Sequence, residues 1–255
     1  KAIIPVHYGG QSCDMNEIKS IAKSHDLKII EDCAHALGSK YKNKMCGNIG
    51  IAGCFSFYPT KVITTGEGGM LTTNNLQIHQ KTIQLKNQGM SITANKREEK
   101  AKWKYDIVDL GYNYRMTNLQ AAVGCAQMER LDELVADKRS IALRYSAELA
   151  VQPGITAFPE PQWGESACWM SGIVVDTRLH GSPSELREKL RAGGVDARPY
   201  WKPLHLQPAF ESTPRTTMPF SDAVWESILT LPCSSALTTS DQEHVIAQMR
   251  KVLSR

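Results

Sequence analysis

Three polar side chains follow apolar runs at positions where an α/β sheet presents groups to a ligand. Asp32 ends the run 27–31, His35 comes three residues later, and Lys61 follows the run 53–57. A lysine amine in a partly dry pocket loses basicity and can act as a Schiff-base nucleophile. A carboxylate such as Asp32 can support a charged ring nitrogen or a metal ion. Taken singly, these residues are more often a helix-capping aspartate, a structural histidine and a solvated loop lysine.

Other motifs with known chemistry lack their usual spacing. The glycine cluster 66–69 has neither the G-x-G-x-x-G of a dinucleotide fold nor the G-K-[ST] of a P-loop. The S-x-x-K at 20–23 lies within an amphipathic pattern and has no S-D-N or K-T-G partner. The sequence contains no H-E-x-x-H and no G-x-S-x-G. The sequence therefore lacks the usual motifs of metal-dependent hydrolases and of serine hydrolases. We expect no metal site.

The first half of the chain predicts the elements that position these residues. Residues 14–25 form an amphipathic pattern with Asp14 as helix N-cap. Short apolar strands are expected at 27–32, 53–57 and 69–73. Helices alternating with apolar strands are typical of an α/β domain with a mostly parallel sheet.

The second half has a different pattern. A helical rhythm runs from 117 to 149 with a break expected near Asp132, and Pro153-Gly154 ends it. A strand is expected at 168–176, a helix with a capping box starting at 182, and a last helix starting at Ser240. Residues 199–235 show little periodicity. We therefore expect an α/β part to about residue 135 and an α+β part from about 150.

Composition excludes several classes of protein. The 255 residues are 42% hydrophobic and 22% charged, which is typical of a globular protein. No apolar run approaches the ~20 residues of a membrane span, so we expect no membrane association. The seven cysteines are scattered and form no C-x-x-C pair. This pattern is typical of a reducing compartment and predicts a cytoplasmic protein.

The positive charge of the chain is local. Residues 81–104 hold seven basic and two acidic residues, a net charge of +5, whereas the whole chain has +4. A nucleic-acid footprint over the whole surface is therefore not supported, and a basic nucleic-acid module is the weakest hypothesis. We favour a solvated loop for this segment over a patch that attracts a small anion.

Several motifs together resemble one family. They are E-D-C-A-H-A at 31–36, F-S-F-Y-P-T-K at 55–61, T-G-E-G-G at 65–69, L-G-Y-N-Y-R-M-T-N-L-Q-A-A at 110–122 and R-P-Y-W-K-P-L-H at 198–205. In this order they resemble the DegT/StrS family of sugar aminotransferases. The resemblance implies the PLP (pyridoxal 5'-phosphate)-dependent transferase fold type I, α/β in class, with a partial, mostly parallel sheet and a smaller α+β C-terminal domain.

The resemblance also implies roles for site residues. Lys61 would be the lysine that binds PLP covalently, and Asp32 would be the partner of its pyridine nitrogen; both are catalytic. His35 falls where the family places Gln or His against the cofactor ring. Ser56 would contact the phosphate. Asn113 would reach the phosphate held mainly by the neighbouring subunit, so a homodimer with shared active sites is expected.

The substrate side follows from the same resemblance. Arg115 and Lys202 would meet a nucleotide diphosphate, His205 belongs to the substrate-side motif, and Trp201 would either stack on a base or sugar or pack internally. Because Lys61 is a lysine, whereas dehydrating relatives have histidine there, the family implies transamination with glutamate as donor. Segments 166–170 and 201–208 look most like members that act on UDP-4-keto-6-deoxy-N-acetylglucosamine (bacillosamine-type), with users of dTDP-linked keto sugars close by.

The family has a substantial N-terminal segment before the point that Lys1 matches. The resemblance thus assigns residues 1–135 to the C-terminal portion of the PLP-binding large domain. Residues 136–255 become the linking helix and the small C-terminal domain. The competing hypothesis is a truncated, non-catalytic member that packs or binds partners without cofactor.

Overall fold

The computed structural model describes residues 1–91 and 104–254. They form two compact units. The first is Lys1–Asp132 with Trp163–Ser166, and the second is Glu133–Gln162 with Ala167–Arg255. Most of the basic segment predicted from the sequence (Lys96, Arg97, Lys100 and Lys102, with Glu98 and Glu99) lies outside the described residues. The assignment of these units to a large and a small domain stays a prediction.

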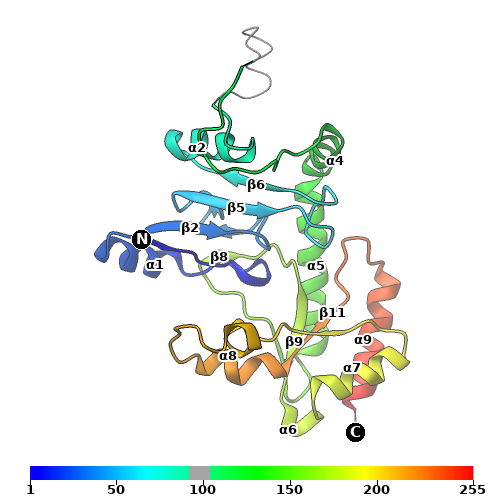
Figure 1. The fold of residues 1–255 in the computed structure, drawn as a ribbon. Coiled ribbons are helices and arrows are strands. Elements are labelled where there is room, and N and C mark those ends of the chain that lie inside the picture. Colours follow the sequence, from blue (N-terminus) through cyan, green and yellow to red (C-terminus); the bar gives the residue numbers. More distant parts are fainter. Residues whose placement is uncertain (92–103, 255) are drawn as a thin grey trace. The chain divides into compact units, whose positions relative to one another are not determined.

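The first unit contains a four-stranded sheet with the order β1-β2-β5-β6 (Figure 1). Its strands are β1 (Ala2–Ile3), β2 (Lys28–Asp32), β5 (Ala52–Ser56) and β6 (Gly69–Thr72). The β1–β2 and β2–β5 pairs are parallel, whereas β5–β6 is antiparallel. The expected mostly parallel sheet is therefore confirmed, and β2 and β5 end at the same edge.

Helices and a small second sheet complete the first unit. The helices are α1 (Met15–Ser24), α2 (Leu76–Lys86) and α4 (Asn118–Met128), with a 3-10 turn η1 at Tyr8–Gly10. The small sheet pairs β3 (Lys40–Tyr41) with β4 (Lys44–Met45) and β8 (Gly164–Glu165). Asp14 caps α1 by accepting a 3.0 Å hydrogen bond from the Asn16 amide. The apolar face of α1 packs with Ile29 and Tyr41, as its periodicity predicts.

The loop interpretation of residues 81–104 is wrong at its start. Lys81 and Lys86 lie on α2, which the sequence did not reveal. The helix begins after Asn75, whose side chain accepts a 3.0 Å hydrogen bond from the Ile78 amide. None of the α2 residues is fully buried, so they lack the apolar stripe by which a helix is recognised.

The helical rhythm from 117 to 149 is two helices, α4 and α5 (Leu131–Leu149). Thr117 and Gln120 form a reciprocal capping box at the start of α4. The break falls at residues 129–130, just before the expected Asp132. Among the described residues, no helix is long and apolar enough to cross a membrane.

The second unit is built on an antiparallel sheet with the order β10-β11-β9-β7. Its strands are β7 (Ile155–Ala157), β9 (Ser171–Val175), β10 (Arg198–Pro199) and β11 (Ile228–Leu231). Besides α5, its helices are α6 (Thr177–His180), α7 (Pro183–Ala192), α8 (Pro219–Val224) and α9 (Thr239–Leu253), and its 3-10 turns are η2 (Leu204–Leu206), η3 (Pro208–Phe210) and η4 (Trp225–Ser227). One core joins sheet and helices through fully buried side chains: Leu149, Ile173, Leu186, Leu190, Leu229 and Met249.

Two expectations for the second unit need correction. The stretch 199–235 contains β11, which lies inside the sheet between β10 and β9. Leu229, Thr230 and Leu231 are all buried, so no apolar–polar alternation marks this strand. The last helix starts at Thr239 instead of Ser240, because Thr238 accepts a 3.1 Å hydrogen bond from the Asp241 amide.

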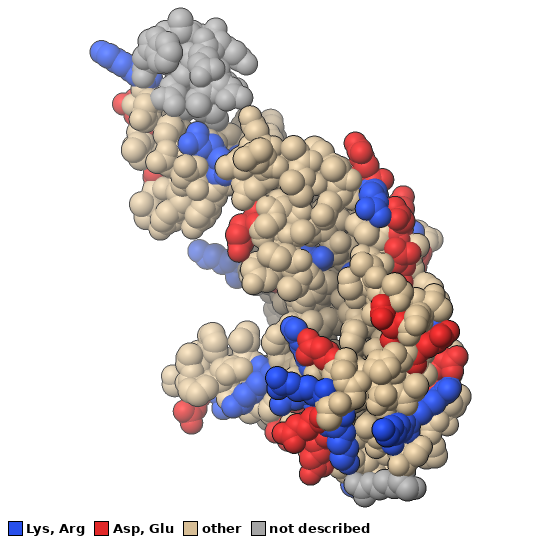
Figure 2. Space-filling view, turned by 90° about the vertical axis from the view of Figure 1, so that its right-hand side faces the viewer, with Lys and Arg blue, Asp and Glu red and all other residues tan. Residues whose placement is uncertain are grey.

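Both signs of charge are intermixed on the face shown in Figure 2. In the second unit, α5 and α9 exchange ion pairs: Arg144 with Glu243 at 3.0 Å, and Arg250 with Glu148. Such pairs stabilise by less than about 1 kcal/mol each. Alternating charge of this kind is typical of a solvated helix surface.

Candidate active site

Asp32 is the last residue of β2, at the carboxyl edge of the parallel strands. Successive residues of a strand point to opposite faces. On β2, Ile29 and Glu31 are buried, whereas Ile30 and Asp32 are half-buried on the other face. Asp32 Oδ1 accepts a 3.0 Å hydrogen bond from the Ala34 amide, which fixes the orientation of the carboxylate. The strand therefore presents a held carboxylate at its end.

Lys61 lies in the loop that leaves β5. The loop is closed by backbone hydrogen bonds from Lys61 N to Tyr58 O (3.0 Å) and from Thr65 N to Phe57 O (3.0 Å). The half-buried position of Lys61 lowers the pKa of its amine, because burial penalises the charged form, and the Asp32 carboxylate opposes part of that shift. The two groups therefore lie within electrostatic reach of each other.

His35 completes this group. Its Nδ1 accepts a 3.3 Å hydrogen bond from the Gly9 amide, and its ring lies 5.6 Å from the ring of Tyr8, centroid to centroid. Burial and, to a smaller extent, the Lys61 cation lower the pKa of His35 to about 4, although Asp32 acts in the opposite direction. A neutral imidazole, a carboxylate and an amine of lowered pKa thus lie within electrostatic reach of one another in the first unit.

The two residues predicted to contact phosphate have different surroundings. Ser56 is the last residue of β5, and its Oγ accepts a 3.3 Å hydrogen bond from the Tyr58 amide in the loop that holds Lys61. Asn113 is exposed; it forms a bridge with Asn87, and its Oδ1 accepts a 3.0 Å hydrogen bond from Arg115 Nε. Ser56 therefore lies on the same strand-to-loop connection as Lys61, whereas Asn113 belongs to an exposed segment.

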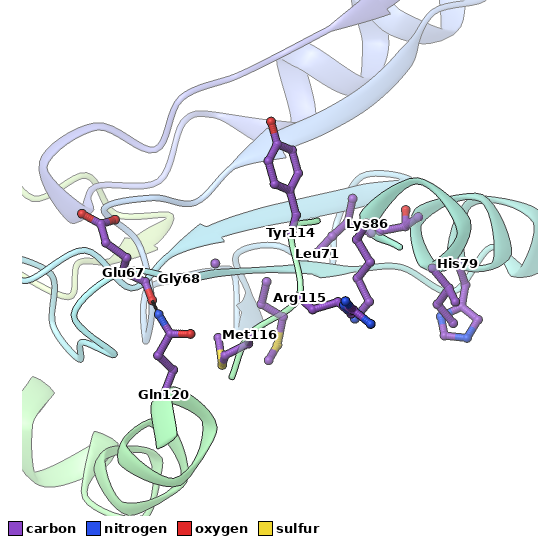
Figure 3. Close-up of a pocket in the computed structure, with 13 residues that line it drawn as sticks. Glu67, Gly68, Leu71, His79, Lys86, Tyr114, Arg115, Met116 and Gln120 are labelled. Atoms are coloured by element: carbon purple, nitrogen blue, oxygen red, sulfur yellow. Dashed lines mark hydrogen bonds between the residues drawn. The ribbon is translucent and has the colours of Figure 1, made fainter. Parts of the chain in front are cut away.

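Arg115 lines a separate cavity of about 830 Å³. Figure 3 shows the Arg115 and Lys86 side chains in the same part of this cavity, with His79 farther along α2. At its other end, Gln120 Nε2 donates a 2.8 Å hydrogen bond to Glu67 O (Figure 3). Asp32, His35 and Lys61 are not among its lining residues. Arg115 therefore lines a cavity that the carboxylate–imidazole–amine group does not line.

The other residues predicted to bind substrate belong to the second unit. Trp201 stacks on Trp169 with centroids 5.6 Å apart and rings inclined by 6°. Trp169 is buried, whereas Trp201 is 45% exposed. The Lys202 carbonyl accepts a 3.2 Å hydrogen bond from Gln207 Nε2, and His205 Nε2 lies 2.6 Å from Asp222 Oδ1. Their role toward a substrate stays a prediction.

Tyr8 and Gly9 are site residues that the sequence analysis missed. They belong to η1, which follows a strand of only two residues. So short a strand has no detectable periodicity, and the contact partner His35 is 26 residues away. The signal available was the pair Gly9-Gly10, both of which have positive φ angles, at 65° and 95°.

Comparison with known proteins identifies the family to which this arrangement belongs. The family model described as "DegT/DnrJ/EryC1/StrS aminotransferase family" matches residues 1–250 of this chain. The chain belongs to this family. The resemblance inferred from the motifs at 31–36, 55–61 and 65–69 is therefore confirmed.

Individual relatives agree. GDP-perosamine synthase of Caulobacter vibrioides is 37% identical over 99% of this chain and 66% of the relative. The spore coat polysaccharide biosynthesis protein SpsC of Bacillus subtilis is 35% identical over 99% of this chain and 67% of the relative. The PLP form of the putative sugar aminotransferase Spr1654 from Streptococcus pneumoniae has a TM-score of 0.88 at 26% identity, covering 99% of this chain and 68% of that one. The fold is that of the PLP-dependent transferases of fold type I.

The chain spans about two thirds of the length of the relatives that it matches. The donor set in the first unit fits the family's cofactor. Lys61 has an amine of lowered pKa that can bind an aldehyde, and Asp32 has a carboxylate that can pair with a protonated ring nitrogen.

Proposed function

We propose that the protein is a PLP-dependent aminotransferase that acts on a nucleotide-linked 4-keto-6-deoxy sugar, with glutamate as amino donor, in surface glycan or polysaccharide biosynthesis. The observation that carries the proposal is the convergence of Lys61, Asp32 and His35 at the carboxyl ends of β5 and β2. Family membership and the names of the relatives support the reaction class.

Each residue of the group has a task in this reaction. Lys61 would bind PLP covalently, because its lowered pKa leaves more of the amine unprotonated than in an ordinary lysine. Asp32 would keep the ring nitrogen of the cofactor protonated, and His35, neutral above pH 5, would lie against the ring. When bound, PLP acts as an electron sink for the substrate carbon that loses its proton. Ser56 and Asn113 would hold the phosphate.

Lys61 would also move the proton. With its Nζ free, Lys61 would take a proton from the substrate carbon and give it to the cofactor carbon two atoms away, on the other side of the nitrogen. A general base works best when its pKa is near the working pH. The partial burial that lowers the pKa of Lys61 therefore serves both covalent binding and proton transfer.

The sugar and nucleotide are finer proposals. The sequence favours a UDP-linked sugar, with dTDP close by, whereas a relative at 37% identity is named for a GDP-linked product. Arg115 and Lys202 would contact the diphosphate, and Trp201 and His205 the sugar or base. Asn113 lies on an exposed segment, which suits a contribution to the site of a second subunit in a homodimer.

A spectroscopic titration tests the proposal. Addition of PLP to the protein is expected to produce a visible absorption band that is absent in Lys61→Ala. Lys44→Ala, which removes an exposed lysine of the first unit on β4, is the matched control and should keep the band. Failure of the wild-type protein to develop the band would favour the non-catalytic alternative.

An activity assay then resolves the substrate. The protein is incubated with glutamate and a panel of UDP-, dTDP- and GDP-linked 4-keto-6-deoxy sugars, and 2-oxoglutarate is measured with a coupled enzyme. We expect production with one nucleotide class well above the others. Equal inactivity with all three classes, in protein that binds PLP, would contradict the sugar assignment while leaving the aminotransferase assignment intact.

A further inference from the structure

A fully buried polar pair lies directly behind the site. His7 and Glu31 are each 0% exposed, and His7 Nε2 lies 3.0 Å from Glu31 Oε2. They are 24 residues apart in the sequence, one in the turn after β1 and the other on β2. Burial of a carboxylate costs several kcal/mol unless partners compensate for lost water. A pair of this kind requires an explanation.

The hydrogen bonds to the two ring nitrogens of His7 and to the Glu31 carboxylate agree on one arrangement. The Cys13 amide donates to His7 Nδ1 at 3.1 Å, so the proton of His7 sits on Nε2 and is donated to Glu31. Glu31 Oε2 also accepts from the Gly47 amide at 2.8 Å, and Oε1 accepts from the Ile49 and Gly50 amides at 2.7 Å each. Burial raises the pKa of Glu31, but these four donors outweigh it, so its pKa is lowered overall and it stays ionised.

A bound metal does not explain the cluster. The donor atoms of His7, Glu31 and Cys33 lie within 4.8 Å of one another. However, both ring nitrogens of His7 and both oxygens of Glu31 are already engaged in the hydrogen bonds described above. The cluster is therefore a complete hydrogen-bonded junction that joins the 7–13 turn, β2 and the 47–50 loop.

This junction is directly linked to Asp32. Glu31 precedes Asp32 on β2 and points to the opposite, buried face of the sheet. The His7 amide donates to Asp32 O at 3.0 Å, and the Asp32 amide donates to Pro5 O at 2.9 Å. Both the amide and the carbonyl group of Asp32 are therefore hydrogen-bonded to the segment that carries His7. The side chain of the preceding residue, Glu31, is hydrogen-bonded to His7 on the opposite face of the sheet.

The same segment contacts His35. Gly9, two residues after His7, donates its amide hydrogen to His35 Nδ1, and Tyr8 places its ring against the imidazole. Movement of the 7–10 turn would therefore displace two of the three site residues together. Lys61 belongs to the loop after β5, and Cys54 of β5 pairs with Asp32, so this turn and β5 together set the distance between Asp32 and Lys61.

We propose that His7 and Glu31 are positioning residues whose buried contact fixes the Asp32 carboxylate relative to the Lys61 amine. The proposal rests on the function proposed above for these two groups, but it concerns their geometry before any cofactor binds. Neither His7 nor Glu31 touches the reacting atoms. Their effect is transmitted through the backbone hydrogen bonds between 5–7 and Asp32.

The test compares two variants that differ by one methylene group. In His7→Gln the longer amide can still donate to Glu31 from the position of Nε2. In His7→Asn the amide oxygen can still accept from Cys13, but the side chain is too short to reach Glu31. Tyr41→Phe is the control for general destabilisation, because it removes a buried hydroxyl that donates to Asp14 at 2.7 Å in the same unit. Asp32→Asn shows how far the pKa of Lys61 shifts when the negative charge of the carboxylate is lost.

The readout is the pKa of Lys61 in cofactor-free protein, measured from the pH dependence of acetylation of its amine by mass spectrometry. Asp32→Asn should lower this pKa, because the carboxylate opposes the effect of burial. His7→Asn should lower it in the same direction, whereas His7→Gln and Tyr41→Phe should leave it at the wild-type value. If the His7–Glu31 pair only stabilised the fold, His7→Asn would leave the pKa of Lys61 unchanged.

The opposing result is equally clear. If His7→Asn lowers the melting temperature but leaves the pKa of Lys61 unchanged, the pair only stabilises the fold and the proposal is wrong. If His7→Asn does not fold, Glu31→Asp, which shortens the carboxylate but keeps its charge, takes its place with the same expectations. Because no cofactor is present, this outcome is separate from failure of the wild-type protein to bind PLP.

Discussion

Lys61 is subject to two opposing influences. Burial lowers the pKa of its amine, and the carboxylate of Asp32 raises it. An amine that is too basic is a poor nucleophile at neutral pH, and a carboxylate held nearby is needed for the ring nitrogen of PLP. Partial rather than complete burial of Lys61 satisfies both requirements. The chemistry of the site thus depends on where the backbone places the two groups.

His35 should make stability depend on pH. Its pKa is about 4 in the folded protein, below the ordinary value of 6.5, so the unfolded chain binds a proton more readily. The free energy of unfolding should therefore decrease as the pH falls from about 6.5 to 4. In His35→Gln, which has no titratable side chain at this position, this part of the decrease should be absent.

Urea unfolding of cofactor-free protein at pH 7 and at pH 5 measures the effect. The wild type should lose more stability between these values than His35→Gln does. Equal losses in the two proteins would show that His35 titrates normally and is not desolvated by its surroundings.

At the residue level, the positions of Asp32 and Lys61 after apolar strands were predictable, because the carboxyl ends of parallel strands meet at one edge. Their roles toward a cofactor came from the family resemblance and stay predictions. His7 was not predictable as the partner of Glu31. The strand before it, β1, is only two residues long, and the 47–50 loop that completes the junction turns at Gly47 with a φ of 87°. Contacts of this kind depend on tertiary structure that local patterns do not encode.

Among the elements, α7 shows how a local signal determines a boundary. Ser182 accepts a 3.3 Å hydrogen bond from the Glu185 amide, and the Glu185 carboxylate accepts a 3.0 Å bond from the Ser182 amide. Pro183 occupies the first helical position, where its missing N–H costs nothing. The helix was therefore predicted with its correct start. By contrast, β11 was missed because it is buried throughout.

Loss of this cap should be measurable. Ser182→Ala should lower the free energy of unfolding by about 1 kcal/mol, because the Glu185 amide loses its acceptor. Ser184→Ala, two residues later and exposed, is the matched control and should change stability by less than about 0.5 kcal/mol. Chemical denaturation of both variants provides the comparison. Equal effects would mean that the capping box contributes nothing.

At the scale of the whole molecule, the chain consists of two compact units. The carboxylate–imidazole–amine group lies entirely in the first unit, and the stacked Trp169 and Trp201 lie in the second. The chain also spans only about two thirds of the length of its relatives. Cofactor chemistry can therefore be argued from the first unit alone, whereas substrate recognition, the homodimer and the cytoplasmic location stay predictions.

The central claim is that Lys61 is the residue that binds PLP. The most direct measurement is reduction of the PLP-treated protein with borohydride, followed by proteolysis and mass spectrometry of the labelled peptide. We expect a pyridoxyl group on Lys61, stoichiometric with protein, and no label at this position in Lys61→Arg. A label spread over exposed lysines, or none on Lys61, would contradict it.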